Sequence, residues 1–163
     1  MTAQLSTDVD PLALERQVCF ALAVTNRAVL AVYRPLLEPL GLTHPQYLVM
    51  LALWDHRKAS PRGPAPLSVK RIAAALQLDP ATLSPMLKRL EALGLVTRTR
   101  SSVDERSTDV ELTAEGLDLR TRALTIPPAV VARLGVDMAE LEELHRVLTR
   151  INAAALAAGT LDN

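Results

Sequence analysis

The feature of this chain that most constrains its fold is a change of hydrophobic period at Gly94. Before it, residues 79–93 begin with an aspartate–proline pair and repeat apolar side chains at helical spacing. After it, residues 95–100 and 108–112 alternate in polarity around a charged turn, which predicts a β-hairpin. A short helix over residues 69–76 precedes this unit. Two short helices, a tight turn and a hairpin in this order predict a winged helix-turn-helix.

Two further helices are predicted ahead of this unit. The first begins at the aspartate–proline pair of residues 10–11 and runs to about Arg34, because Pro35 disfavours helical geometry in the residue before it. The second is capped by Thr43 and is apolar almost all round over residues 46–56. A helix that is apolar on every side is usually buried, so the second helix is expected to form the core.

The rest of the chain is also expected to be helical. Residues 59–66 hold three prolines and a glycine and are predicted to be a loop. Helices are predicted over residues 114–125, over residues 129–134 and from residue 137 to about residue 158. The predicted fold class is therefore mainly α with a small β-hairpin.

Composition limits the class of protein. The single cysteine excludes an internal disulfide and suits a reducing compartment. The longest charge-free run, residues 39–54, is too short and too broken by prolines for a transmembrane helix. The first fifteen residues are acidic and lack the basic start of a secretory signal. We therefore expect a soluble cytoplasmic protein with no membrane partner.

The charge distribution favours a nucleic-acid partner, although the formal net charge is zero. Residues 57–106 hold ten basic and four acidic side chains, whereas both flanking segments are acidic. This basic segment coincides with the predicted winged unit, so we expect it to bind double-stranded DNA. The alternative is a solvated surface on which Arg98 and Arg100 pair with Asp109 and Glu111 across the hairpin. The candidate DNA-binding residues are Thr82, Ser84, Lys88 and Arg89 on the helix and Arg98, Arg100, Asp104 and Arg106 on the hairpin.

The terminal helices have apolar stripes that the winged unit does not use. We expect residues 10–40 and 114–163 to form a dimerisation scaffold and residues 43–113 to form the DNA-binding lobe of one domain spanning residues 1–163. A symmetric dimer would match a pseudo-palindromic operator, because each half-site is read by one protomer.

Several blocks of sequence resemble the MarR family of bacterial repressors, and within it the organic-hydroperoxide-sensing OhrR branch with one cysteine. The resemblance covers roughly residues 12–128. The blocks that carry it are Gln-Val-Cys-Phe-Ala-Leu at 17–22, Tyr-Arg-Pro-Leu-Leu at 33–37, Leu-Thr-His-Pro-Gln-Tyr-Leu-Val-Met at 42–50, the helix at 78–91, and the wing at 94–96, 104–106 and 112–116. It implies a dimeric repressor that leaves its operator when the cysteine is oxidised. The chain departs from the branch at Ala23 and His44, where tyrosines are usual, and in its longer 59–66 loop.

The spacing of Cys19 and Tyr33 bears on that resemblance. The two residues are fourteen positions apart, so they point in similar directions but lie about 21 Å apart along one helix. An antiparallel copy of the helix crossing near Asn26 would bring Cys19 of one chain beside Tyr33 of the other. The resemblance implies a thiolate that is hydrogen-bonded by this tyrosine. His44 would act beside it, either protonated or as a neutral hydrogen-bond donor.

Cys19 has no second cysteine with which to form a disulfide. Its sulfenic acid would form a mixed disulfide with a low-molecular-weight thiol, form a sulfenamide or proceed to sulfinic acid. Two alternatives to the hydroperoxide sensor remain: a repressor released by a small phenolic ligand, and a thiol-dependent peroxidase. The peroxidase is disfavoured, because the chain lacks a resolving cysteine and a glycine loop for anions. The three histidines lack metal-ligand spacing, so neither a metal nor a cofactor is expected.

Overall fold

The computed structural model of the protein describes residue 10 and residues 12–59, 65–104 and 106–159. The chain is mainly helical with one small antiparallel sheet, as the sequence predicts. Its elements, in chain order, are η1 Leu14–Arg16, α1 Val18–Leu37, η2 Glu38–Leu40, α2 His44–Ala59, β1 Leu67–Ser68, α3 Val69–Leu76, α4 Pro80–Ala92, β2 Val96–Arg100, β3 Thr108–Leu112, α5 Ala114–Ala123, α6 Ile126–Leu134 and α7 Met138–Ala157.

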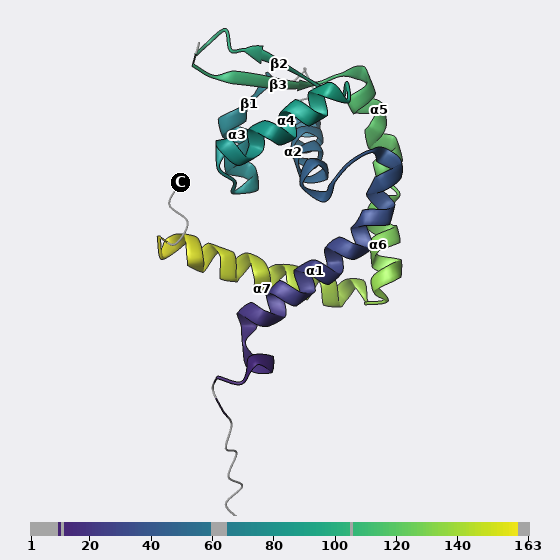
Figure 1. The fold of residues 1–163 in the computed structure, drawn as a ribbon, viewed down its shortest axis with the longest axis vertical. Coiled ribbons are helices and arrows are strands. Elements are labelled where there is room, and N and C mark those ends of the chain that lie inside the picture. The colour runs from purple at the N-terminus through teal and green to yellow at the C-terminus, as the bar shows by residue number, and fades with distance from the viewer. Residues whose placement is uncertain (1–9, 11, 60–64, 105, 160–163) are drawn as a thin grey trace, which may run out of the picture.

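The elements gather in two parts, which Figure 1 shows one above the other. In the upper part, α2, α3 and α4 pack beneath the sheet, and the β2–β3 hairpin extends beyond them. In the lower part, α1 packs against α6, and α7 runs away from the lower end of α6. Helix α5 leads from the sheet down into α6 and so connects the two parts.

The core lies in the upper part and is built around α2. Side chains with less than 2% exposure come from α1, α2, α3, α4 and both long strands: Leu37, Val49, Met50, Ile72, Leu83, Leu87, Leu90, Val96 and Val110. Burying one such side chain contributes about 1.5–3 kcal/mol. The predicted core helix is confirmed, although Leu51 on its outer face is 40% exposed.

Local capping chemistry shapes the helix-turn-helix. The side chains of Ser68 and Asp79 each accept a hydrogen bond from a backbone amide in the first turn of α3 and α4. Between the helices, Gln77 has a φ of 52°, the left-handed conformation that closes a tight turn. Gly94 ends the α4 segment with a φ of 72°, as its position in the sequence predicts. The short turn fixes α4 at an angle to α3 and exposes its outer face.

The sheet has one strand more than the sequence predicts. β3 pairs with β2 in the predicted hairpin and with β1 on its other side. In the second pairing Leu67 lies opposite Val110, and Ser68 lies opposite Asp109. A strand of two residues is too short to show alternation, so the pattern could not reveal it. Of the predicted 59–66 loop, residues 60–64 lie outside the described residues.

Three predicted helix boundaries were wrong. Helix α1 begins at Val18 rather than at residue 11, which lies outside the described residues, and it continues through Pro35 to Leu37. The last turn of α1 persists because it buries Leu37, which is 1% exposed, in the core. Helix α6 begins at Ile126 rather than at residue 129, because its prolines occupy the first turn, where no amide partner is needed.

Candidate nucleic-acid interface and cysteine site

A groove of about 470 Å³ separates α4 from the wing, the β2–β3 hairpin. Among its lining residues are four of the predicted DNA-binding residues: Ser84, Arg98, Asp104 and Arg106. Lys70 from the first turn of α3 adds a positive charge at its edge. The other four predicted residues, Thr82, Lys88, Arg89 and Arg100, are exposed but do not line the groove. Hydroxyls and cations on two neighbouring elements form a surface that suits phosphates and base edges.

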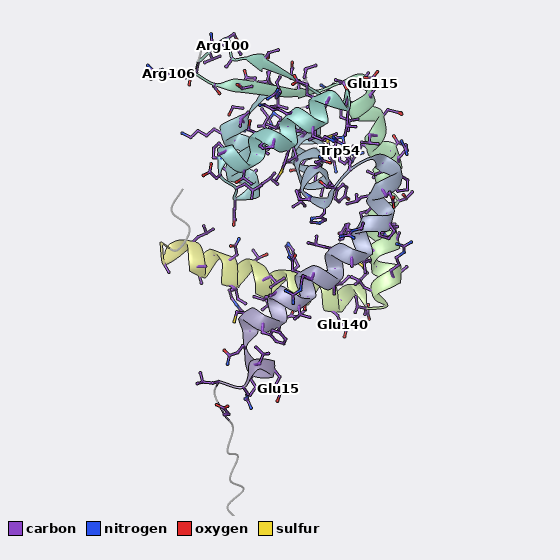
Figure 2. All side chains as sticks on the ribbon, in the orientation of Figure 1. Glu15, Trp54, Arg100, Arg106, Glu115 and Glu140 are labelled. Carbon is purple, nitrogen blue, oxygen red and sulfur yellow. The ribbon has the colours of Figure 1, made fainter. Side chains whose placement is uncertain are left out.

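The tip of the wing is shaped by Asp104. Its carboxylate accepts a hydrogen bond from the Arg106 amide at 3.0 Å, and its carbonyl accepts one from the Ser107 amide at 2.8 Å. The hairpin closes with a bond of 2.9 Å from the Ser101 amide to the Ser107 carbonyl. Asp104 therefore holds the turn, and the Arg106 side chain is exposed at the free end of the hairpin, with Arg100 nearby (Figure 2).

Arg98 is bound to α4, the candidate recognition helix of the helix-turn-helix, rather than across the hairpin. Its Nη2 and Nε donate to Glu91 Oε2 at 2.6 and 2.9 Å, and its backbone amide donates to Glu91 Oε1 at 3.3 Å. This hydrogen-bonded guanidinium lowers the pKa of the Glu91 carboxyl. The alternative, in which Arg98 and Arg100 pair with Asp109 and Glu111, is wrong, because the register places Arg98 opposite Val110 and Arg100 opposite Thr108. The Glu91–Arg98 pair ties the wing to α4.

We expect this pair to position the wing. Glu91→Gln and Arg98→Ala should each weaken operator binding about 3- to 10-fold, because the wing loses its fixed angle to α4. Neither variant should change the salt dependence by the roughly one unit that a lost phosphate contact would give. Operator titrations at several salt concentrations measure both quantities. Tighter binding by Glu91→Gln would instead show that Arg98 contacts DNA once it is released.

Because the pKa of Glu91 is lowered, the Glu91–Arg98 pair should persist at neutral pH and be lost only as the pH falls through that depressed value.

Cys19 lies exposed in the first turn of α1. Of the twenty residues of α1 only Leu37 is buried, although the helix is rich in apolar side chains. By length and composition alone, the stretch Val18–Leu40 could cross a membrane, but one such helix is weak evidence for a membrane span. An exposed apolar helix in a folded chain more often marks an interface with another protein.

The far end of α1 contacts the start of α2 through a cluster of rings. The rings of Tyr33 and His44 meet edge to face with centroids 4.9 Å apart, and Tyr47 lies 6.1 Å from Tyr33. Burial raises the pKa of Tyr33 and lowers the pKa of His44. At neutral pH the tyrosine therefore keeps its proton, and the imidazole is neutral. A cavity of about 540 Å³, lined by residues that include Arg34 and His44, opens beside this cluster.

The structure thus brings together Tyr33 and His44 but leaves Cys19 at the other end of the same helix, about 21 Å away along its axis. Three residues of these clusters had no predicted role: Glu91, Tyr47 and Trp54, whose ring centroid lies 6.5 Å from that of Tyr47. The two aromatic residues lie seven positions apart, and that helical spacing was a signal that they share one face of α2. No local pattern relates Glu91 to a strand residue seven positions later.

Comparisons with known proteins agree with this geometry. The model of the SarA/Rot transcriptional regulator family matches residues 31–121. The organic hydroperoxide resistance transcriptional regulator of Bacillus subtilis (strain 168) is 41% identical over 139 residues, which are 85% of this chain and 89% of that protein. Reduced AbfR bound to DNA has a TM-score of 0.72 at 30% identity and covers 89% of this chain and 94% of its own; AbfR is a protein of Staphylococcus epidermidis.

A MarR-family transcriptional regulator from Rhodococcus sp. RHA1 has a TM-score of 0.73 at 25% identity and covers 86% of this chain and 95% of its own. These relatives are regulators of transcription rather than enzymes. Together with the helix-turn-helix, the wing and the cysteine-bearing first helix, they show that the chain belongs to the MarR family of transcriptional regulators, in the branch of the organic hydroperoxide resistance regulators.

Proposed function

We propose that this protein is a dimeric repressor that senses organic hydroperoxides through Cys19 and then releases its operator. The observation that carries the proposal is an exposed cysteine on an unburied apolar helix of a chain 41% identical to a regulator named for organic hydroperoxide resistance. The low-polarity surface of α1 and the DNA-facing groove belong to different parts of the fold, so signal and output occupy separate sites. The protein would work in the cytoplasm, where operator DNA lies.

The apolar surfaces of α1 and α7 support a dimer. No residue of α7 is buried in one protomer. Large exposed apolar side chains on or just before the two helices are Leu12, Leu14, Val18, Phe20, Leu22, Val24, Val136, Met138, Leu144, Leu148, Ile151 and Leu156. So much exposed apolar surface is unusual in a monomer. We assign residues 10–40 and 114–163 to the dimerisation scaffold and residues 43–113 to the DNA-binding lobe.

On DNA, α4 would enter the major groove and the wing would follow the backbone into the minor groove. Thr82, Ser84, Lys88 and Arg89 offer hydroxyls and cations to phosphates and base edges. Arg100 and Arg106 at the wing suit the negative potential of a narrow minor groove. Two lobes held by one scaffold would bind the two half-sites of a pseudo-palindromic operator.

The sensor would be completed by the second protomer. In an antiparallel crossing of the two α1 helices, the partner's Cys19 would lie beside Tyr33 and His44. Because Tyr33 keeps its proton and His44 is neutral at pH 7, both would stabilise the thiolate as hydrogen-bond donors rather than through a full positive charge. Of the two alternatives that the sequence left open for His44, its lowered pKa supports the neutral donor.

The chemistry needs one hydroperoxide for each cysteine. The thiolate attacks the distal oxygen of the hydroperoxide, the O–O bond breaks, and a proton from solvent completes an alcohol while the sulfur becomes a sulfenic acid. A low-molecular-weight thiol then displaces water and forms a mixed disulfide. The larger oxidised group would not fit the packed helix crossing, so the scaffold shifts and the half-site spacing is lost.

A second candidate function is release by a small phenolic ligand. The cavity of about 540 Å³ beside His44 and Arg34 favours it, because its size suits a small organic molecule. The two candidate functions predict different results for the variant Cys19→Ser. A ligand would release Cys19→Ser as readily as it releases the wild type, whereas a hydroperoxide would release only the wild type.

The DNA-binding part of the proposal is tested at the wing. Arg106→Ala should weaken operator binding and lower the slope of log K against log salt by about one, because one phosphate contact and its released counterion are lost. Arg133→Ala is a matched control, since Arg133 is exposed on α6 in the scaffold part. Fluorescence anisotropy with labelled operator at several salt concentrations measures both. An Arg106→Ala variant with unchanged affinity and slope would exclude the wing from the interface.

A further inference from the structure

A buried hydrogen bond joins α2 to the start of α5 across 62 residues of sequence. The indole Nε1 of Trp54 donates to the carbonyl of Gly116 at 2.9 Å. Trp54 is 5% exposed and is the single tryptophan of the chain. It lies inside the upper part of the molecule (Figure 2). A buried bond of this kind fixes the distance between two elements, because neither group has water as an alternative partner.

Gly116 is held against the segment that joins the recognition helix to the wing. A Cβ at Gly116 would lie 2.1 Å from the Leu95 carbonyl oxygen, so only glycine permits this approach. Beside it, the Thr113 amide donates to the Leu95 carbonyl at 3.1 Å, and its hydroxyl donates to the Gly94 carbonyl at 2.6 Å. A displacement of Gly116 would therefore move the turn that joins α4 to β2.

The other end of α2 lies at the proposed sensor. His44 begins the helix against Tyr33, and Tyr47 bridges them to Trp54, with ring centroids 6.5 Å apart in the last pair. His44 and Trp54 are ten residues apart, which is about 15 Å along a helix. The four rings form a row of packed side chains that leads from the Tyr33 end of α1 to the first turn of α5. Because each ring packs against the next, a shift of one ring displaces its neighbour.

We propose that Trp54 is the positioning residue that couples the state of Cys19 to the recognition helix and the wing. This inference rests on the proposed function, since it names the route by which oxidation reaches DNA. Displacement of the rings would shift α2. The Trp54–Gly116 bond would pass this shift to the first turn of α5, and the contacts of that turn with Gly94 and Leu95 would pass it to the end of α4. Because Glu91 and Arg98 bind the wing to α4, both DNA-reading elements move together.

The test compares operator affinity before and after cumene hydroperoxide for three full-length proteins. In Trp54→Phe a ring remains but the N–H donor is lost. Leu53→Val is the matched control, because Leu53 is 3% exposed on the same helix and loses only packing volume. The ratio of oxidised to reduced dissociation constants should fall about fivefold or more in Trp54→Phe and stay near the wild-type value in Leu53→Val.

Each outcome decides between the claims. If Trp54→Phe keeps the wild-type ratio, or if Leu53→Val lowers it equally, the coupling role of Trp54 is wrong while the proposed function stands. If the wild type itself is not released, the proposed function fails and this inference fails with it.

A second measurement needs no substitution at Trp54. As the single tryptophan, Trp54 supplies the intrinsic fluorescence of the protein. Its emission should change after hydroperoxide at the rate of operator release in the wild type and stay constant in Cys19→Ser. Constant emission throughout wild-type release would overturn the proposal, even if Trp54→Phe does not fold.

Discussion

Leu148→Glu is expected to abolish dimerisation and, with it, specific operator binding. Leu148 is 37% exposed on an α7 face shared with Leu144 and Ile151. In a dimer this face would be buried, and an unpaired buried carboxylate costs about 3–5 kcal/mol. That cost corresponds to a weakening of the dimer by roughly 100-fold or more. A single lobe reads one half-site, so affinity for the full operator should fall by a similar factor.

Analytical ultracentrifugation and operator titration measure the two effects. Arg150→Gln is the matched control, because it changes the net charge by the same amount on the exposed polar side of α7. Deleting residues 137–163 should produce the stronger defect, giving monomer or aggregate. A Leu148→Glu protein that remains dimeric and binds the full operator would place the dimer interface on another surface.

Cys19→Ser is expected to bind operator as tightly as the wild type in reducing buffer and to ignore organic hydroperoxide entirely. Serine differs from cysteine by one atom, but its hydroxyl does not ionise near neutral pH and does not attack the O–O bond. The exposed position of Cys19 means that the substitution removes no core packing within the protomer. The fold of the DNA-binding lobe should therefore be unchanged.

Tyr33→Phe makes the comparison quantitative. It keeps the ring beside His44 but removes the hydroxyl, so the thiolate loses one hydrogen-bond donor and release should be slower rather than absent. Gel-shift time courses after hydroperoxide measure the three rates. Equal rates of release for Cys19→Ser and the wild type would show that Cys19 takes no part in release and would support the ligand-released alternative.

The elements of the fold were predictable where a local interaction determines them. Ser68, Asp79, Thr113 and Asp137 cap their helices with side-chain hydrogen bonds, and all four belong to the residue types that favour a helix start. Strand β3 was predicted with its observed bounds. The errors arose where packing overrides local preference. The last turn of α1 survives Pro35 because it buries Leu37, and β1 exists because β3 offers an open edge.

The site was predictable to the level of residue type and element, but not to the level of contact. The basic residues lie on α4 and the wing as expected, and Tyr33 and His44 meet. The Glu91–Arg98 pair and the Trp54–Gly116 bond join residues whose approach depends on how α4, β2, α2 and α5 pack. Glu91 and Arg98 lie on either side of the change from helix to strand, and Trp54 and Gly116 are 62 residues apart, so no periodicity could indicate either contact.

The central claim is that oxidation of Cys19 releases the operator. It is tested most directly by adding cumene hydroperoxide to the wild-type protein on its operator, with a thiol such as glutathione present. Released DNA and the mass of the Cys19 peptide are then followed in the same samples. We predict that release rises in proportion to the fraction of Cys19 peptide carrying the mixed disulfide, and that a reductant restores both. Release that proceeds while the Cys19 peptide keeps its reduced mass would contradict the account.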